Sequence, residues 1–216
     1  SKKGHEVSSH SWAHKNAKRL TIEQVKSEIE KNDSAIYANI GIVPRTYCYP
    51  YNYKTEEIVS MASKGRVATR TKQISIGGKS TPERFDKWLK DLMKAEDWGV
   101  GMTHGINSLF WEHLDKVKSM EDQIWVGTFC EVASYIKERE EIQLKVSNKK
   151  NGMTITPKLK LDRKLFAEPL TMVIQGETMN GILVKQGRKE LPVYINGNKV
   201  MFDFNPYGGT IKIHFN

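Results

Sequence analysis

The spacing of hydrophobic residues changes near residue 140, and this change constrains the fold of the 216-residue chain more than any other feature. Before residue 140, apolar residues at helical spacing alternate with short β-branched runs. After residue 140, short apolar runs at a spacing close to two follow one another, which is typical of strands with one buried face. The sequence therefore predicts an α/β domain over residues 1–140 and a small β-sandwich-like domain over residues 141–216.

The first domain is predicted to repeat a strand and a helix about four times. Strands are expected over four short apolar runs, at residues 35–43, 66–70, 98–104 and 124–128. Helix starts are indicated by two capping boxes and by a proline at a first helical position: Thr21 with Gln24, Thr128 with Glu131, and Thr81 before Pro82. Such alternation favours a parallel sheet covered by helices, and ligand sites in these sheets lie at the carboxyl ends of the strands.

The second domain is predicted to be antiparallel. Its apolar runs are separated by turn signals, among them Asn-Gly pairs at residues 151–152, 180–181 and 196–197. The last of these pairs fits a tight hairpin. We expect this domain to supply no catalytic group.

The charge balance does not by itself indicate a nucleic-acid partner. The chain carries a formal net charge of +9, which is a common property of nucleic-acid binders. Residues 1–140, however, hold 22 Lys and Arg against 19 Asp and Glu, and residues 141–216 hold 12 against 6, scattered as singles and pairs. We therefore predict no nucleic-acid partner, and an anionic surface such as a cell envelope is an equally good use of this charge.

Other classes of protein are excluded by composition. No apolar run approaches the ~18 residues of a membrane span. Two cysteines do not make a disulfide scaffold. The first ten residues have no apolar core of the kind found in signal peptides, so no signal peptide is expected in this sequence.

The segment His10-Ser11-Trp12-Ala13-His14 is the most informative stretch for chemistry. Two imidazoles at positions i and i+4 face the same way if the segment turns helically, as a two-histidine metal site requires. The alternative is a polar loop that contains two unrelated histidines.

Two further signals follow predicted strands. His104 ends an apolar strand and is well placed for acid–base work, unless it is a histidine satisfied within the core. Residues 47–53, YCYPYNY, place four tyrosines around a proline; these could line a sugar-binding groove, or half of them could be core. Cys48 could be a catalytic thiol only with a histidine and an orienting group nearby, which the sequence does not show.

These motifs resemble a known family. Residues 4–14, GHEVSSHSWAH, resemble the H-[ST]-x-x-H metal motif of the polysaccharide deacetylases, also called the NodB-homology family or carbohydrate esterase family 4. YCYPYNY is similar to the family's third motif, R-x-P-[YF]-G, and residues 102–105, MTHG, to its late L-x-H motif. Residues 125–140 resemble the final strand and helix of members that carry a trailing β-domain. Together the motifs cover most of residues 1–140.

The resemblance implies an incomplete distorted (β/α) barrel and the metal-dependent hydrolysis of N- or O-linked acetyl groups on a carbohydrate. It also implies a divalent metal, most commonly zinc, and an extracytoplasmic location. The residues that it assigns are the metal ligands His10 and His14, the general acid His104, the oxyanion-binding Tyr51 beside Pro50, and Met102 in the acetyl pocket.

The sequence departs from the family pattern at important positions. The family's first motif, T-F-D-D-G, supplies a base and a third ligand, and this chain contains no Asp-Asp pair. The barrel's first strand and helix are expected to be missing, and Cys48 and Asn52 stand where the third motif has arginine and glycine. We therefore expect either a truncated deacetylase that is inactive as this fragment, or a non-catalytic carbohydrate-binding protein on the same scaffold. A basic module that binds the cell envelope or nucleic acid is the third reading.

Overall fold

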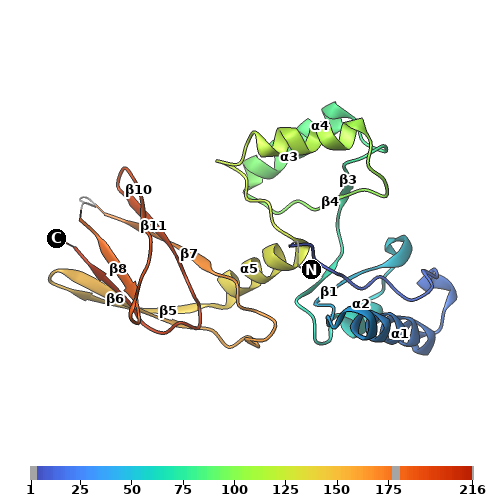
Figure 1. The fold of residues 1–216 in the computed structure, drawn as a ribbon, viewed down its shortest axis with the longest axis horizontal. Coiled ribbons are helices and arrows are strands. Elements are labelled where there is room, and N and C mark those ends of the chain that lie inside the picture. The colour runs from blue at the N-terminus through green and yellow to red at the C-terminus, as the bar shows by residue number, and fades with distance from the viewer. Residues whose placement is uncertain (1–3, 177–180, 216) are drawn as a thin grey trace. The chain divides into compact units, whose positions relative to one another are not determined.

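The computed structural model describes residues 4–176 and 181–215 and divides into two compact units, residues 1–132 and 133–216 (Figure 1). The division falls inside helix α5 (Phe129–Glu141). Each unit is described by itself. Of the helices that the described residues form, none combines the length and the apolar character that crossing a bilayer requires.

The first unit is a mixed α/β structure with short strands that pair in parallel. Strand β1 pairs with β2, and β3 pairs with β4. Ser9 adds a parallel bridge to Tyr47 on the other side of β1. The elements are η1 (Ala17–Arg19), α1 (Ile22–Ile40), β1 (Thr46–Cys48), η2 (Pro50–Asn52), α2 (Glu56–Ser63), β2 (Ala68–Arg70), β3 (Ile74–Ser75), α3 (Pro82–Ala95), β4 (Gly101–Met102) and α4 (Ser108–Lys118).

Helix starts follow the local signals in the sequence. Thr21 and Gln24 form the predicted capping box, in which each side chain bonds the other's backbone N–H. Thr128 caps Glu131 in the same reciprocal way at the start of α5. Helix α3 begins at the predicted Pro82.

Two of the predicted strands are wrong. Residues 35–40 continue helix α1, because the capped helix propagates until Gly41, whose left-handed backbone (φ 69°) bonds its N–H to the Tyr37 carbonyl at 2.8 Å. The apolar run is also not buried, since Tyr37, Ile40 and Val43 are all exposed. Residues 124–128 form no strand, and Val126 is 68 % exposed there.

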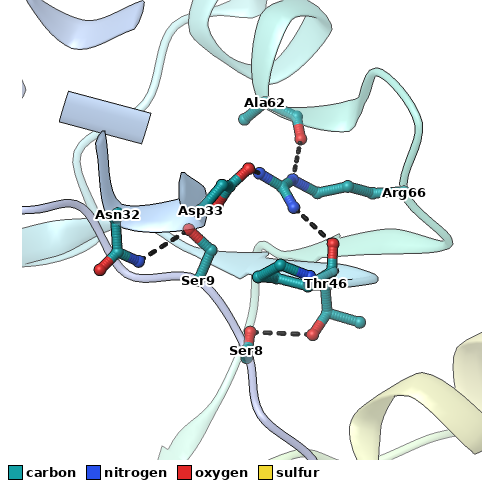
Figure 2. Close-up of polar contacts among 8 residues, drawn as sticks. Ser8, Ser9, Asn32, Asp33, Thr46, Ala62 and Arg66 are labelled. Atoms are coloured by element: carbon teal, nitrogen blue, oxygen red, sulfur yellow. Dashed lines mark hydrogen bonds and ion pairs between the residues drawn. The ribbon is translucent and has the colours of Figure 1, made fainter. Parts of the chain in front are cut away.

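The core of the first unit that matters for the site joins α1, β1 and α2. Its buried members are Val25, Ile29, Tyr47, Tyr49, Ile58 and Ala62. A polar network ties the same three elements together (Figure 2). Arg66 donates to the carbonyls of Ala62 at 2.9 Å and Pro44 at 2.6 Å and forms an ion pair with Asp33. These contacts fix β1 against both helices, and β1 leads directly into the candidate site.

A second polar link in Figure 2 positions the start of the histidine motif. Asn32 of α1 donates to the hydroxyl of Ser9 at 2.9 Å, and Thr46 of β1 donates to that of Ser8 at 2.8 Å. Ser9 and Thr46 are fully buried. The segment that leads into His10 is therefore held on α1 and β1 before the loop begins.

The second unit consists of two antiparallel sheets around one core. One sheet has the order β5-β6-β12-β8-β9 and the other β10-β11-β7. Buried residues of both sheets form a single cluster, which includes Ile155, Leu170, Val184, Phe202 and Ile213. The strands are β5 (Gln143–Lys149), β6 (Gly152–Lys158), β7 (Leu170–Gln175), β8 (Leu183–Gln186), β9 (Lys189–Glu190), β10 (Tyr194–Asn196), β11 (Lys199–Phe204) and β12 (Ile211–His214).

The predicted Asn-Gly turns agree with this topology where they are described. Asn196 pairs with Lys199 in the β10–β11 hairpin, so Gly197 and Asn198 form a two-residue turn. The pair at 151–152 joins β5 to β6. The pair at 180–181 begins at a residue that lies outside the described part of the chain.

Candidate functional site

The two histidines of the HxxxH segment lie side by side. Their ring centroids are 4.8 Å apart, with the ring planes inclined by 69°. The segment is not helical; Ser11 (φ 70°) and His14 (φ 50°) both have left-handed backbones, and this bend brings the rings together. The two rings therefore lie close together, and a tight loop, not the helical turn expected from the spacing, places them there.

Glu28 of helix α1 holds this loop in place. Its Oε2 atom accepts hydrogen bonds from the Ala13 N–H at 2.7 Å and the Ser11 hydroxyl at 2.8 Å. Its Oε1 atom lies 3.7 Å from the Lys15 ammonium group. Burial by itself would raise the pKa of Glu28, but these donors outweigh it, so the pKa lies below its ordinary value.

His10 has a defined tautomer. Its Nδ1–H donates to the Cys48 carbonyl at 2.8 Å, because a carbonyl oxygen can only accept. This leaves the Nε2 lone pair as the coordinating atom, the arrangement that orients metal-binding histidines.

The surroundings of His10 keep its ring neutral. Burial is the main reason that the pKa of His10 lies below its ordinary value. Electrostatic interactions with His14, Arg70 and His104 lower the pKa further, while the hydrogen bond to Cys48 acts in the opposite direction. A neutral imidazole at ordinary pH is the form that can coordinate a metal or accept a proton.

The tyrosine-rich segment divides between core and site. Tyr47 and Tyr49 are each 2 % exposed and belong to the core, and Tyr53 packs partly buried against it. Tyr51 is 64 % exposed, and its ring centroid lies 4.9 Å from that of His14. One tyrosine of the four therefore completes the ring cluster, which we define as His10, His14 and Tyr51.

Backbone strain is concentrated in the loops that carry this cluster. Five non-glycine residues of the described chain have a positive φ, and four of them are in these two loops: Ser11, His14, Tyr51 and Asn52. Each such conformation costs of order 1–3 kcal/mol and persists only where the surrounding structure enforces it, which is a common feature of binding sites.

His104 and Met102 lie at the end of strand β4. Met102 is the last residue of β4 and is half-buried, and His104 follows in an exposed bend. The charge of His104 acts on His10, so the two side chains are within electrostatic range of one another. Pro50 is the first residue of η2 and is buried, and Tyr51 follows it in the chain.

Cys48 is a poor nucleophile. Burial raises the pKa of its thiol, and the Ser8 hydroxyl lies 3.9 Å from the sulfur. The thiolate is the reactive form, so a raised pKa suppresses it near neutral pH. Its backbone carbonyl, which orients His10, is the part of Cys48 that the site uses.

The histidine pair fits two positions of a metal site but does not complete one. In a tetrahedral zinc site with bonds of ~2.0–2.1 Å, two coordinating nitrogens lie about 3.4 Å apart, and rings whose centroids are 4.8 Å apart can bring two nitrogens that close. Catalytic zinc sites have three protein ligands. Within residues 4–176 and 181–215, no group of three or more His, Cys, Asp or Glu side chains is placed to hold an ion.

Sequence reasoning missed Glu28 and Arg70. Glu28 lies between the buried Val25 and Ile29 of α1, so a carboxylate on the apolar face of an amphipathic helix was the signal that could have found it. Arg70 is paired in register with Cys48 across β1 and β2, a neighbour relation that no local pattern reveals.

A family model supports the resemblance seen in the sequence. The model described as polysaccharide deacetylase matches residues 1–68, the part of the chain that holds His10, His14 and the tyrosine-rich segment. No curated protein matches the chain.

Solved structures of carbohydrate esterase family 4 are also similar to part of the chain. A family 4 pseudoenzyme from Bacillus anthracis is 24 % identical, with a TM-score of 0.46, over 59 % of this chain and 46 % of that one. A family 4 carbohydrate esterase from Streptomyces lividans, in complex with acetate, is 18 % identical, with a TM-score of 0.44, over 56 % of this chain and 63 % of that one. A mutant of the peptidoglycan deacetylase PdaC from Bacillus subtilis is 20 % identical, with a TM-score of 0.46, over 64 % and 68 %. The chain therefore spans about half the length of the pseudoenzyme.

Proposed function

We propose that the protein acts on acetylated carbohydrates at the ring cluster His10, His14 and Tyr51, because the family model described as polysaccharide deacetylase matches residues 1–68. A complete site of this kind hydrolyses an N- or O-linked acetyl group, and this chain carries the part of such a site that binds and orients the substrate. The observation that carries the proposal is the convergence of the three rings, with the Nε2 atom of His10 left available by the hydrogen bond to Cys48.

The residues present support binding and orientation of such a substrate. The exposed Tyr51 ring offers a flat apolar face of the kind that stacks on a sugar. The exposed Trp12 ring, 58 % accessible between the two histidines in sequence, offers a second such face. In this proposal the Tyr51 backbone N–H faces the acetyl oxygen, and Pro50 and Met102 shape the space for the acetyl group.

His104 is the proton donor in this proposal. Its exposed position after β4 allows a substrate to approach it, and its charge reaches His10. Protonation of the departing nitrogen or oxygen is the step that a histidine at this place would perform. His10 and His14 would contribute two ligands to a divalent metal, in the first place zinc, which when bound polarises the acetyl carbonyl.

Two observations favour a non-catalytic function for the chain of 216 residues. Its described residues provide two ligands where a catalytic site needs three, and its sequence contains no Asp-Asp pair. We therefore expect this chain to bind acetylated oligosaccharides while releasing acetate at close to the uncatalysed rate.

The test measures binding, metal content and acetate release in the same preparations. Isothermal titration with an acetylated hexosamine oligosaccharide should give binding that His14→Ala weakens at least about tenfold, whereas His214→Ala, an exposed histidine of the C-terminal unit, leaves it unchanged. Zinc content should fall in His10→Ala and His14→Ala and stay unchanged in His104→Ala. Acetate release well above the uncatalysed rate after the metal is removed by chelator would contradict the assigned chemistry, and equal binding by wild type and His14→Ala would contradict the assigned site.

We also propose an extracytoplasmic location, because acetylated polymers of the cell envelope are the substrates that this reaction implies. Fractionation of cells that produce the native protein, followed by immunodetection, tests this. Recovery only with the cytoplasmic fraction would refute it.

A further inference from the structure

A pocket adjoins the ring cluster and shares Tyr51 with it. The pocket has a volume of about 340 Å³ and is lined by Lys15, Asn16, Arg19, Leu20 and Tyr51. This is at the small end of the ~300–1,000 Å³ that small-molecule sites occupy, and suits a single sugar unit. Because the Tyr51 ring also lies 4.9 Å from His14, a ligand held at the ring cluster would place its next unit in this pocket.

The lining is cationic. Lys15 and Arg19 contribute two positive charges, and no carboxylate lines the pocket. Lys15 also forms an ion pair with Glu28, whose Oε1 atom lies 3.7 Å from the ammonium nitrogen. Arg19 is an exposed residue, and among the described residues no carboxylate lies within 4.0 Å of its guanidinium group. The charge of Arg19 therefore remains available to a ligand.

The other lining groups match a saccharide rather than a small free ion. The side-chain oxygen of Asn16 accepts the Lys18 N–H at 3.0 Å, so its amide NH₂ group is left to donate elsewhere. Leu20 and the Tyr51 ring provide apolar surface. Donors beside an apolar wall and an aromatic face suit a ligand that is itself part polar and part apolar, as sugars are.

We propose that this pocket is a subsite for an anionic group, a carboxylate or a phosphate, on the sugar unit next to the one that the ring cluster binds. The inference rests on the proposed function and narrows its substrate to an acidic glycan. Arg19 is the residue that determines this preference, since a guanidinium group presents two parallel N–H donors to the two oxygens of such an anion.

The electrostatic setting of the ring cluster agrees with an anionic ligand. Arg70, which is paired in register with Cys48, is one of the charged groups that lower the pKa of His10. Within the described residues no carboxylate joins these groups to form a cation site. The positive charge of Arg70 near the ring cluster therefore adds to the charges of Lys15 and Arg19 in attracting a negatively charged ligand.

The experiment compares two variants that remove the same charge. Arg19→Gln alters the pocket, and Lys18→Gln alters the adjacent residue of η1, which is exposed and does not line it. Titration calorimetry on the full chain uses three acetylated hexosamine oligosaccharides of equal length. The first is neutral, the second carries a carboxylate on the unit adjacent to the acetylated end, and the third carries a phosphate on that unit. Inorganic phosphate, acetate and a single-stranded oligonucleotide of matched charge are the remaining probes.

We expect the wild-type protein to bind an anionic oligosaccharide at least about tenfold more tightly than the neutral one, the effect of one charged hydrogen-bonded contact. Arg19→Gln should abolish this difference and leave neutral binding unchanged, whereas Lys18→Gln should retain the difference within about twofold. The carboxylate and phosphate arms identify which anion the subsite prefers.

Several results would overturn the inference. If neutral and anionic oligosaccharides bind equally, and both depend on His14, the anionic subsite is refuted while the proposed function stands. If no oligosaccharide binds to the folded protein, the proposed function fails, and the subsite with it. If free phosphate binds as tightly as the phosphorylated oligosaccharide, the claim that the pocket recognises a sugar unit is refuted. If the oligonucleotide binds more tightly than the oligosaccharides and this binding depends on Arg19, the pocket is assigned to nucleic acid.

Discussion

Arg66 is expected to be the side chain whose loss most weakens the N-terminal unit, and Arg66→Met tests this. Its side chain is 5 % exposed and bonds two backbone carbonyls and Asp33. Methionine keeps much of the apolar stem but leaves the carbonyls of Ala62 and Pro44 and the Asp33 carboxylate unpaired. The Oδ1 atom of Asp33 already has no partner, so the carboxylate has little to replace the ion pair.

The size of the effect follows from burial. Breaking a buried ion pair costs about 3–5 kcal/mol. Because the Asp33 side chain is 30 % exposed and regains some hydration, we expect a value at the lower end, about 3 kcal/mol. With a urea m-value of about 2 kcal/mol/M for a unit of this size, the midpoint of unfolding should fall by about 1.5 M.

Intrinsic tryptophan fluorescence gives an assay that reports on this unit alone. All five tryptophans of the chain, at positions 12, 88, 98, 111 and 125, lie within residues 1–132. The matched control is Lys87→Met, which breaks an ion pair with Asp91 whose two side chains are 77 % and 63 % exposed. The control should change stability by less than about 0.5 kcal/mol.

A double variant separates the ion pair from the rest of the network. Arg66→Met combined with Asp33→Asn should recover about 1–2 kcal/mol relative to the sum of the single changes, because the uncompensated charge is removed. If Arg66→Met shifts the urea midpoint no more than Lys87→Met, the argument from burial is refuted.

Glu28→Gln should destabilise the N-terminal unit by about 1–2 kcal/mol at neutral pH, because charged acceptors make the stronger hydrogen bonds. Folding lowers the pKa of Glu28. Its contribution to the free energy of unfolding is therefore complete above the ordinary glutamate pKa near 4.3 and is lost as pH falls through the folded pKa. The urea midpoints of wild type and Glu28→Gln should converge in acid. The pKa of His10 should lie below the ordinary histidine value near 6.5. Long-range nitrogen–proton NMR at pH 7 should show the Nδ1–H tautomer of His10, and an Nε2–H tautomer would contradict its hydrogen bond to the Cys48 carbonyl. Gly152→Ala should destabilise the C-terminal unit by at least about 2 kcal/mol, because the Cβ of an alanine there would overlap the Ile213 carbonyl oxygen. Hydrogen exchange of the strand amides by mass spectrometry measures this, and unchanged protection would count against the close approach.

Several features of the fold were predictable because their causes are local. Capping at Thr21 and Thr128 depends on residues three positions apart, and both capping boxes form. The period-two pattern after residue 140 predicted the antiparallel strands, because alternate side chains must face one core. The family resemblance carried by His10 and His14 is likewise a matter of short spacing, and the family model over residues 1–68 confirms it.

Other features were decided by contacts between segments that are distant in sequence. Residues 35–40 look like a strand by composition, but no neighbouring strand pairs with them, and the helix that begins at Ile22 runs through them. The four tyrosines of YCYPYNY look alike in sequence, whereas the packing of β1 against α1 and α2 buries Tyr47 and Tyr49 and leaves Tyr51 at the site.

The sequence by itself determined which residue types are present for chemistry and where the capped helices begin, because each of these depends on spacing within a few residues. The tertiary structure alone decided how those residues meet. Glu28 bends the loop that brings His10 and His14 together, and the Cys48 carbonyl selects the tautomer of His10. Both contacts join residues at least fifteen positions apart, and burial of the partners, which no local pattern specifies, gives them their strength.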